Sequence, residues 1–126
     1  MMNKVQLIEK LQYFVAVQLD NMAKTNPVIS FFKPIASRAL KKKLSGITGA
    51  LDLIADENGN IDAEGIVSEM TASLMNTQPF RIMVPALGEL TIGGGRIEMG
   101  IPFTDKSIVL GENDLIELKE ILTSKQ

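Results

Sequence analysis

The feature that most constrains this fold is a change of hydrophobic period at Pro79, because helices and strands bury apolar side chains at different spacings. Before Pro79, apolar residues recur at steps of three or four, which is the period of one helical face. Beyond it, short segments alternate between apolar and polar side chains and are rich in β-branched residues, as half-buried strands are. This order predicts an α+β fold, with N-terminal helices followed by a small antiparallel β-meander and a C-terminal helix.

The first helix is expected over residues 4–24, with Asn3 as its N-cap. Its apolar residues cover more of its surface than one narrow stripe requires, and such a helix packs on two sides or against a partner subunit. One set follows the helical period and a second set widens it: Val5, Ile8, Leu11, Val15, Leu19 and Met22, then Leu7, Phe14 and Val17.

A second helix begins at Asn26 and Pro27, residue types that suit the N-cap and the first helical position. It is expected to end near Leu44. Pro34 lies inside this segment and should kink the helix or divide it in two, because proline lacks the N–H that a helix interior needs. The residues expected to face the core are Phe31, Ile35 and either Ala39 or Leu40.

Helical spacing resumes over residues 47–54, and Asn58-Gly59 then marks a turn. Asp62 is placed to cap a further helix that runs to about Asn76.

The region after Pro79 contains segments typical of short strands, with Leu87-Gly88 and the glycines at 93–95 as turns. Asn113 is expected to cap the C-terminal helix. The expected strands are FRIMV, ELTI, RIEMGI and SIVLG.

The composition excludes several classes of active site. Of 126 residues, 45% are hydrophobic, which suits a single domain over residues 1–126, with a mainly helical part (1–77) and a part holding the meander and last helix (78–126). The chain contains no cysteine and no histidine. Thiolate chemistry, histidine-dependent triads and ordinary zinc sites are therefore excluded. No catalytic residue, metal site or cofactor is predicted, and the expected protein is not an enzyme.

The stretch DENGNID is similar to part of a calcium-binding loop but lacks the ligands that such a loop has at its two ends. With Gly59 in the glycine position, Ile54 and Gly65 occupy the first and last ligand positions. With Asp56 first instead, Val67 stands where a bidentate glutamate is needed. A turn followed by an Asp-capped helix is the favoured interpretation.

Three consecutive glycines before Arg96 raise the question of a phosphate site. A phosphate loop opens onto a helix N-terminus, whereas residues 96–101 alternate and are expected to form a strand. The Lys-Ser/Thr pair of a P-loop and the spacing of a dinucleotide-binding loop are both absent. A hairpin turn is favoured, and a small anion nest of backbone N–H groups beside Arg96 is the alternative.

Charge is distributed unevenly along the chain. Residues 1–44 carry a net charge of +6 and residues 45–126 a net charge of −8, so that the two parts could face opposite ways or meet head to tail in an oligomer. The overall charge of −2, the few aromatic residues and the lack of a known motif argue against nucleic-acid binding. The candidate contacts for a small anion are Arg38, Lys42, Arg81 and Arg96.

No segment approaches the length of apolar sequence that a transmembrane helix needs, and polar residues interrupt the apolar run that a signal peptide would require near the N-terminus. We therefore expect no membrane contact and a cytoplasmic protein.

The string LDLIADENGNIDAEGIVSEM, followed by PALGELTI and an acidic amphipathic helix, resembles small uncharacterised proteins of bacteriophages and prophages over about residues 50–122. The resemblance implies a bacterial host cytosol or a virion and carries no catalytic residues. With the broad first helix and the charge asymmetry, it leads us to expect a non-enzymatic, homo-oligomeric binding protein. Such a protein would sequester a host protein or a small anionic, nucleotide-like ligand; a virion structural or assembly component is the alternative.

Overall fold

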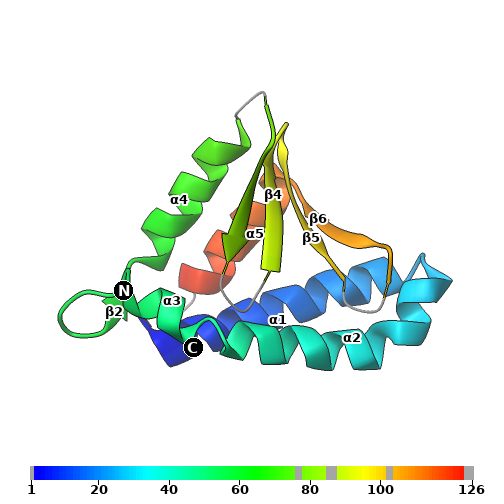
Figure 1. Cartoon of the computed structure of the whole chain (residues 1–126), viewed down its shortest axis with the longest axis horizontal. Coiled ribbons are helices and arrows are strands. Elements are labelled where there is room, and N and C mark those ends of the chain that lie inside the picture. The colour runs from blue at the N-terminus through cyan, green and yellow to red at the C-terminus, as the bar shows by residue number, and fades with distance from the viewer. Residues whose placement is uncertain (1, 76–77, 85–87, 102–103, 124–126) are drawn as a thin grey trace.

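The computed structural model describes residues 2–75, 78–84, 88–101 and 104–123 (Figure 1). The helices are α1 (Lys4–Ala23), α2 (Pro27–Ser45), α3 (Thr48–Asp52), α4 (Ala63–Leu74) and α5 (Glu112–Thr123). The strands are β1 (Met2–Asn3), β2 (Asn60–Ile61), β3 (Phe80–Val84), β4 (Gly88–Gly93), β5 (Arg96–Gly100) and β6 (Ser107–Leu110). The predicted α+β class and its order of helices, meander and final helix are confirmed.

The helices form two pairs around one face of the sheet. Figure 1 shows α1 and α2 side by side beneath the strands, while α4 and α5 stand along the sheet. The helix α1 packs against α2 and also contacts α3 and α5, so it is covered on more than one side. These contacts on several sides bury much of the broad apolar surface that was expected for α1.

Local capping explains where the first two helices begin. The Asn3 side chain accepts a hydrogen bond from the Gln6 N–H at 2.9 Å, and the Gln6 side chain accepts from the Asn3 N–H at 3.2 Å. This reciprocal pair is a capping box. Asn26 likewise accepts from the N–H groups of Val28 and Ile29 at the start of α2.

The strands β3, β4, β5 and β6 form an antiparallel meander in that order. The register gives the sheet two different faces. The inner face carries two apolar rows across the strands, Phe80–Ile92–Ile97–Leu110 and Ile82–Leu90–Met99–Ile108. The outer face carries Arg81, Thr91, Glu98 and Val109 in one row.

The glycine triplet makes the tight turn between β4 and β5. Gly94 and Gly95 have φ of 65° and 83°, the positive values at both central positions that a two-residue type I′ hairpin requires. The Gly95 N–H donates to the Leu74 carbonyl at 2.9 Å, so the turn also closes the C-terminal end of α4. The predicted hairpin turn is confirmed.

The core consists of two hydrophobic clusters that share α1. The first includes Leu7 and Phe14 of α1 with buried residues from α4, α5, β4 and β5. The second includes Leu19 of α1 with buried residues from α2 and β6. Val15 packs against both clusters, so the two parts of the core meet on α1.

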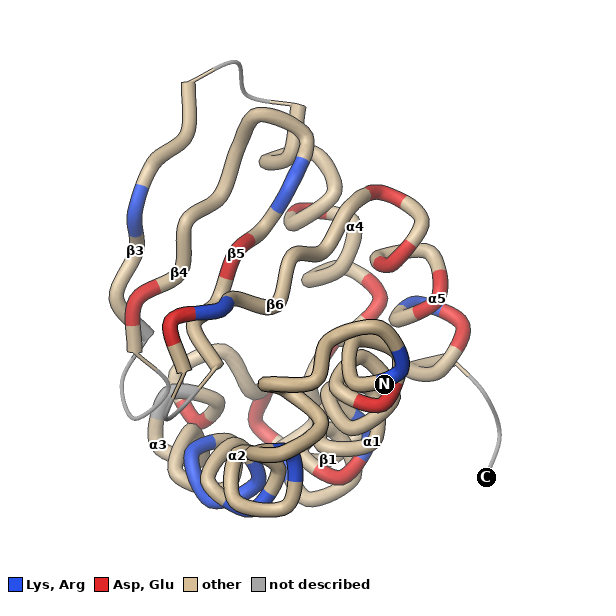
Figure 2. The backbone as a smooth tube through the Cα atoms, turned by 90° about the vertical axis from the view of Figure 1, so that its right-hand side faces the viewer, with Lys and Arg blue, Asp and Glu red and all other residues tan. Residues whose placement is uncertain are grey.

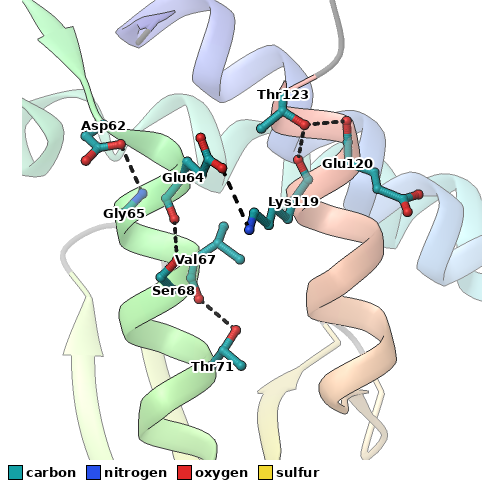
Figure 3. A network of polar contacts seen from close by, with 9 residues as sticks. All are labelled: Asp62, Glu64, Gly65, Val67, Ser68, Thr71, Lys119, Glu120 and Thr123. Carbon is teal, nitrogen blue, oxygen red and sulfur yellow. Dashed lines mark hydrogen bonds and ion pairs between the residues drawn. The ribbon is translucent and has the colours of Figure 1, made fainter.

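A polar network joins the exposed edges of α4 and α5 (Figure 3). Lys119 on α5 forms an ion pair with Glu64 on α4 at 3.7 Å. Asp62 caps α4 as predicted, and its carboxylate accepts from the Gly65 N–H at 3.0 Å. The ion pair is largely exposed and contributes little, so the two helices are held mainly by buried side chains such as Val67.

The predicted core face of α2 is wrong in part. Phe31 and Ile35 are 78% and 51% exposed, whereas Leu40 is buried as expected, on a face it shares with Ile29. Residues 29 and 31 differ by about 200° around a helix, so only one of them can face α1. The face is completed by Ala36 and Leu44.

Two predicted boundaries also differ. Of the two effects expected of Pro34, division of the helix does not occur, because α2 continues from Pro27 to Ser45; a kink at Pro34 stays a prediction. Asn113 is not a cap, because α5 already begins at Glu112. The Asp114 carboxylate instead accepts from the Gly111 N–H at 2.8 Å, an interaction that ties the residue before the helix to its first turn.

The antiparallel pairing of β1 with β2 was not expected. It joins Met2 to Ile61 and Asn3 to Asn60, across most of the helical part of the chain. Met2–Asn3 is too short for an alternating pattern to identify it as a strand. Residues 85–87 and Asn76, where a turn and a helix end were expected, lie outside the described residues.

We expect Gly93→Ala to destabilise the protein by roughly 1–3 kcal/mol, because Gly93 has φ of 127° and an added Cβ would stand 2.8 Å from the Pro79 Cα. Urea unfolding measures this loss. Gly49→Ala is the matched control: a Cβ there meets nothing within 4 Å, and alanine favours the helix. Equal stability of the two variants would contradict the steric argument.

Candidate functional site

The cations predicted to contact an anion lie on different parts of the molecule. Arg38 and Lys42 are exposed on α2, whereas Arg81 lies on β3 and Arg96 at the start of β5. The Gly94-Gly95 turn beside Arg96 and the helix α2 are at opposite ends of the view in Figure 1. The structure therefore does not bring the four side chains together around one anion.

The two sheet arginines share the outer face but have carboxylate partners there. The Arg81 Nε lies 3.3 Å from the Glu89 Oε1, and the Arg96 Nε lies 2.9 Å from the Glu98 Oε1. The strand β4 separates β3 from β5, which places the two arginines about 10 Å apart across the sheet. Each guanidinium is thus an exposed, paired cation.

The backbone beside Arg96 is also occupied. An anion nest needs successive N–H groups that point outward together. The Gly95 N–H instead donates to the Leu74 carbonyl, so the turn binds α4 through one of the groups that a nest would use. The turn has a structural role in closing that helix.

The DENGNID segment uses its carboxylates for turns and caps. The Asp56 Oδ1 accepts from the N–H groups of Asn58 and Asn60, each at 2.9 Å. Asp62 accepts from Gly65. Within the described ranges, no group of three or more acidic side chains is placed to hold a metal ion.

A feature that the sequence did not reveal is an interior cavity of about 280 Å³ between the inner face of the sheet and the helices. Its wall comes from α1, α4, α5, the three strands β4 to β6 and the segment that runs from the end of α2 past α3. Every atom that faces the cavity is apolar. Its volume approaches the lower end of the usual range for small-molecule sites, about 300–1,000 Å³.

The cavity reaches the surface beside α3. Ile54 lines the cavity and is 54% exposed, so this side chain marks the opening. On the other side, Leu90 of β4 lines the cavity and pairs with Ile82 of β3, which is 37% exposed. The apolar wall therefore continues from the interior onto β3.

Gln18 of α1 is the polar residue among the described side chains that line this cavity. It is 8% exposed, and its Nε2 has no hydrogen-bond partner within the described part of the chain. A buried donor without an acceptor costs roughly 1–3 kcal/mol, and such groups are rare in folded proteins. Gln18 is therefore the feature of the cavity that packing alone does not explain.

Gln12, six residues earlier on the same helix, shows the ordinary arrangement in which a side-chain amide has partners. Its Nε2 donates to the Lys41 carbonyl at 3.0 Å and to the Ser45 Oγ at 3.1 Å. Both glutamines interrupt an apolar helix, so the residue type alone does not distinguish them. The signal that marks Gln18 is its position one turn after Phe14, on a buried face.

No family model, curated protein or solved structure matches this chain. Within the described residues, none of the helices combines the length and the apolar character needed to cross a membrane. The candidate site therefore stands on its own geometry: an apolar cavity with one buried amide at its wall.

We expect Gln18→Met to raise the free energy of unfolding by about 1–3 kcal/mol, since methionine has a similar shape and removes the unpartnered donor. Gln12→Met is the matched control and should lower stability, because it removes two hydrogen bonds that join α1 to the end of α2. Urea denaturation compares the two. A loss of stability in both variants would contradict this account of Gln18.

Proposed function

We propose that this chain is a non-enzymatic binding protein that holds a small apolar molecule in its interior cavity. The observation that carries the proposal is the cavity itself, about 280 Å³ in volume and apolar over its whole surface. Protein interiors are close-packed, and voids much larger than a water molecule are few in a domain. A cavity of this size is more than packing irregularity requires.

The volume limits the size of the ligand. At about 30 Å³ for each water-sized group, the cavity accommodates on the order of ten non-hydrogen atoms. Burial of apolar ligand surface stabilises the complex by about 25 cal/mol for each Å² removed from water. The half-exposed Ile54, an apolar side chain of the cavity wall, provides an entry path of the same character.

This proposal replaces the small anion expected from the sequence with an apolar ligand. The four candidate cations are dispersed, and the two sheet arginines face carboxylates. No charged residue lines the cavity within the described part of the chain. The resemblance to phage and prophage proteins, and with it a host or virion setting, remains a separate prediction.

We expect n-butylbenzene, which has ten carbon atoms and no polar group, to bind in the cavity. At ten times its Kd, the ligand would stabilise the folded protein by about 1.4 kcal/mol and raise Tm by several degrees. Methyl resonances of cavity residues such as Val67 and Leu118 should shift in an NMR titration, whereas those of the exposed Val109 should not.

A cavity-filling variant gives the control. Ala63 is buried at the cavity wall, and Ala63→Leu should abolish the shifts while the circular dichroism spectrum stays helical. Ala72→Leu adds the same atoms at an exposed position on α4 and should bind as the unmodified chain does. The proposal fails if n-butylbenzene changes neither Tm nor the cavity resonances.

We also propose that copies of the chain associate head to tail through opposite charges. The exposed cations at the C-terminal end of α2 have no ion-pair partner in the described ranges, although Lys33 earlier in that helix pairs with Asp20. Figure 2 shows these cations gathered on α2, away from the acidic residues of α4 and α5. When the same contact between two different surfaces repeats from copy to copy, it builds either a closed ring or an open filament. The cations are Arg38, Lys41, Lys42 and Lys43.

If these charges drive association, the oligomer should dissociate as salt rises, because the Debye length falls from about 30 Å at 10 mM to about 3 Å at 1 M. Sedimentation velocity across this range measures the effect. The double variant Lys42→Glu/Lys43→Glu should be monomeric at low salt. Lys106→Glu, an exposed lysine outside the helices, serves as the control. A monomer at every salt concentration excludes this mode of association.

A further inference from the structure

We propose that the ligand of the cavity is an uncharged molecule that carries a hydrogen-bond acceptor near one end, and that the Gln18 amide donates to this acceptor. A ketone, an ester or a lactone with an apolar body has this chemistry. The inference rests on the proposed function, because it names the class of ligand that the cavity takes.

The first support is the unsatisfied donor. The Gln18 Nε2 is buried and has no hydrogen-bond partner in the described part of the chain. A water molecule is a poor partner, because a buried water needs two to four polar contacts and the cavity surface is apolar. A ligand held in place by the apolar wall needs only one polar contact, and an amide N–H supplies it to an oxygen acceptor.

The second support is the lack of a counter-charge. No charged side chain belongs to the described residues that line the cavity. A carboxylate or phosphate buried here would lose its hydration without an opposite charge to replace it, and that cost is large. The single neutral donor at this wall, the Gln18 amide, suits a neutral acceptor such as a carbonyl oxygen, whose burial costs far less than that of a charge. Free fatty acids and nucleotides are therefore excluded as occupants of the cavity.

The position of Gln18 orients the ligand. The residues of α1 that line the cavity are, in order, Leu7, Leu11, Phe14, Val15 and Gln18. Residues 7 and 18 are eleven steps apart, which is about 16 Å along a helix. Because Gln18 is the last of them, the acceptor of the ligand lies at the end of the cavity near Gln18 and the apolar body extends toward Leu7.

The Gln18 side chain changes rotamer to reach the ligand. Every atom facing the cavity is apolar, so both polar atoms of the Gln18 amide lie behind the cavity surface. Rotation about the aliphatic torsions of the side chain moves the whole amide between staggered positions, and the terminal torsion then turns the N–H toward the acceptor. The backbone of α1 does not have to move. Ligand binding thus satisfies a donor that the protein by itself leaves unpaired.

Three probes of similar size test the inference by isothermal titration calorimetry: n-butylbenzene; 4-phenylbutan-2-one, which has the same ten carbons with a carbonyl oxygen near the end of the chain; and 4-phenylbutyrate, which carries a carboxylate. The measured quantity is the Kd of n-butylbenzene divided by the Kd of 4-phenylbutan-2-one. We compare this ratio in the unmodified chain with the same ratio in Gln18→Met, by dividing the first by the second. This cycle cancels the different hydration of the two ligands. We expect a value of about ten, equivalent to about 1.4 kcal/mol.

Gln12→Met is the matched control, since its amide has partners outside the cavity, and its value should be near one. A value near one for Gln18→Met, with both neutral probes bound, overturns the role of Gln18 and leaves the proposed function standing. Tighter binding of 4-phenylbutyrate than of 4-phenylbutan-2-one overturns the uncharged class. Failure of n-butylbenzene to bind overturns the proposed function and this inference with it.

Discussion

The burial of α1 on more than one side is the constraint on which the rest of this structure depends. Leu7 and Phe14 belong to one hydrophobic cluster and Leu19 to the other, while Val15 packs against both. The pair of α2 with α1 closes one part of the core, and α5 with the sheet closes the other. A polar substitution at Val15 would therefore affect both clusters at once.

The cavity follows from the same arrangement. Helices that cross a small sheet at different angles cannot fill all of the space between them unless large side chains meet there, and the wall of this cavity includes the small residue Ala63 at the start of α4. An unpartnered amide at such a wall lowers stability. Local choices that oppose stability are concentrated at functional sites in natural proteins. Gln18 and the cavity together therefore provide the reason to treat this interior as a binding site.

The outer surface has a different character from the interior. The sheet arginines Arg81 and Arg96 face Glu89 and Glu98, whereas the cations at the end of α2 have no such partners in the described ranges. Exposed pairs of this kind contribute little to stability. The surface charges matter instead for association, because the distribution of charge over the surface affects how fast the protein meets other molecules and further copies of this chain.

The sequence by itself determined the features that depend on neighbouring residues: the caps at Asn3, Asn26 and Asp62, the four strands of the meander, and the hairpin turn at Gly94 and Gly95. Each follows from a local hydrogen bond, an alternation or a positive φ. The core face of α2, the pairing of β1 with β2 and the cavity around Gln18 were decided only by the tertiary structure. Phe31 and Ile29 are equally apolar, and Gln12 and Gln18 are the same residue on one helix. The packing of distant segments decides that Ile29 is buried while Phe31 is exposed. It also decides that the Gln12 amide donates to two acceptors while the Gln18 Nε2 has none in the described part of the chain.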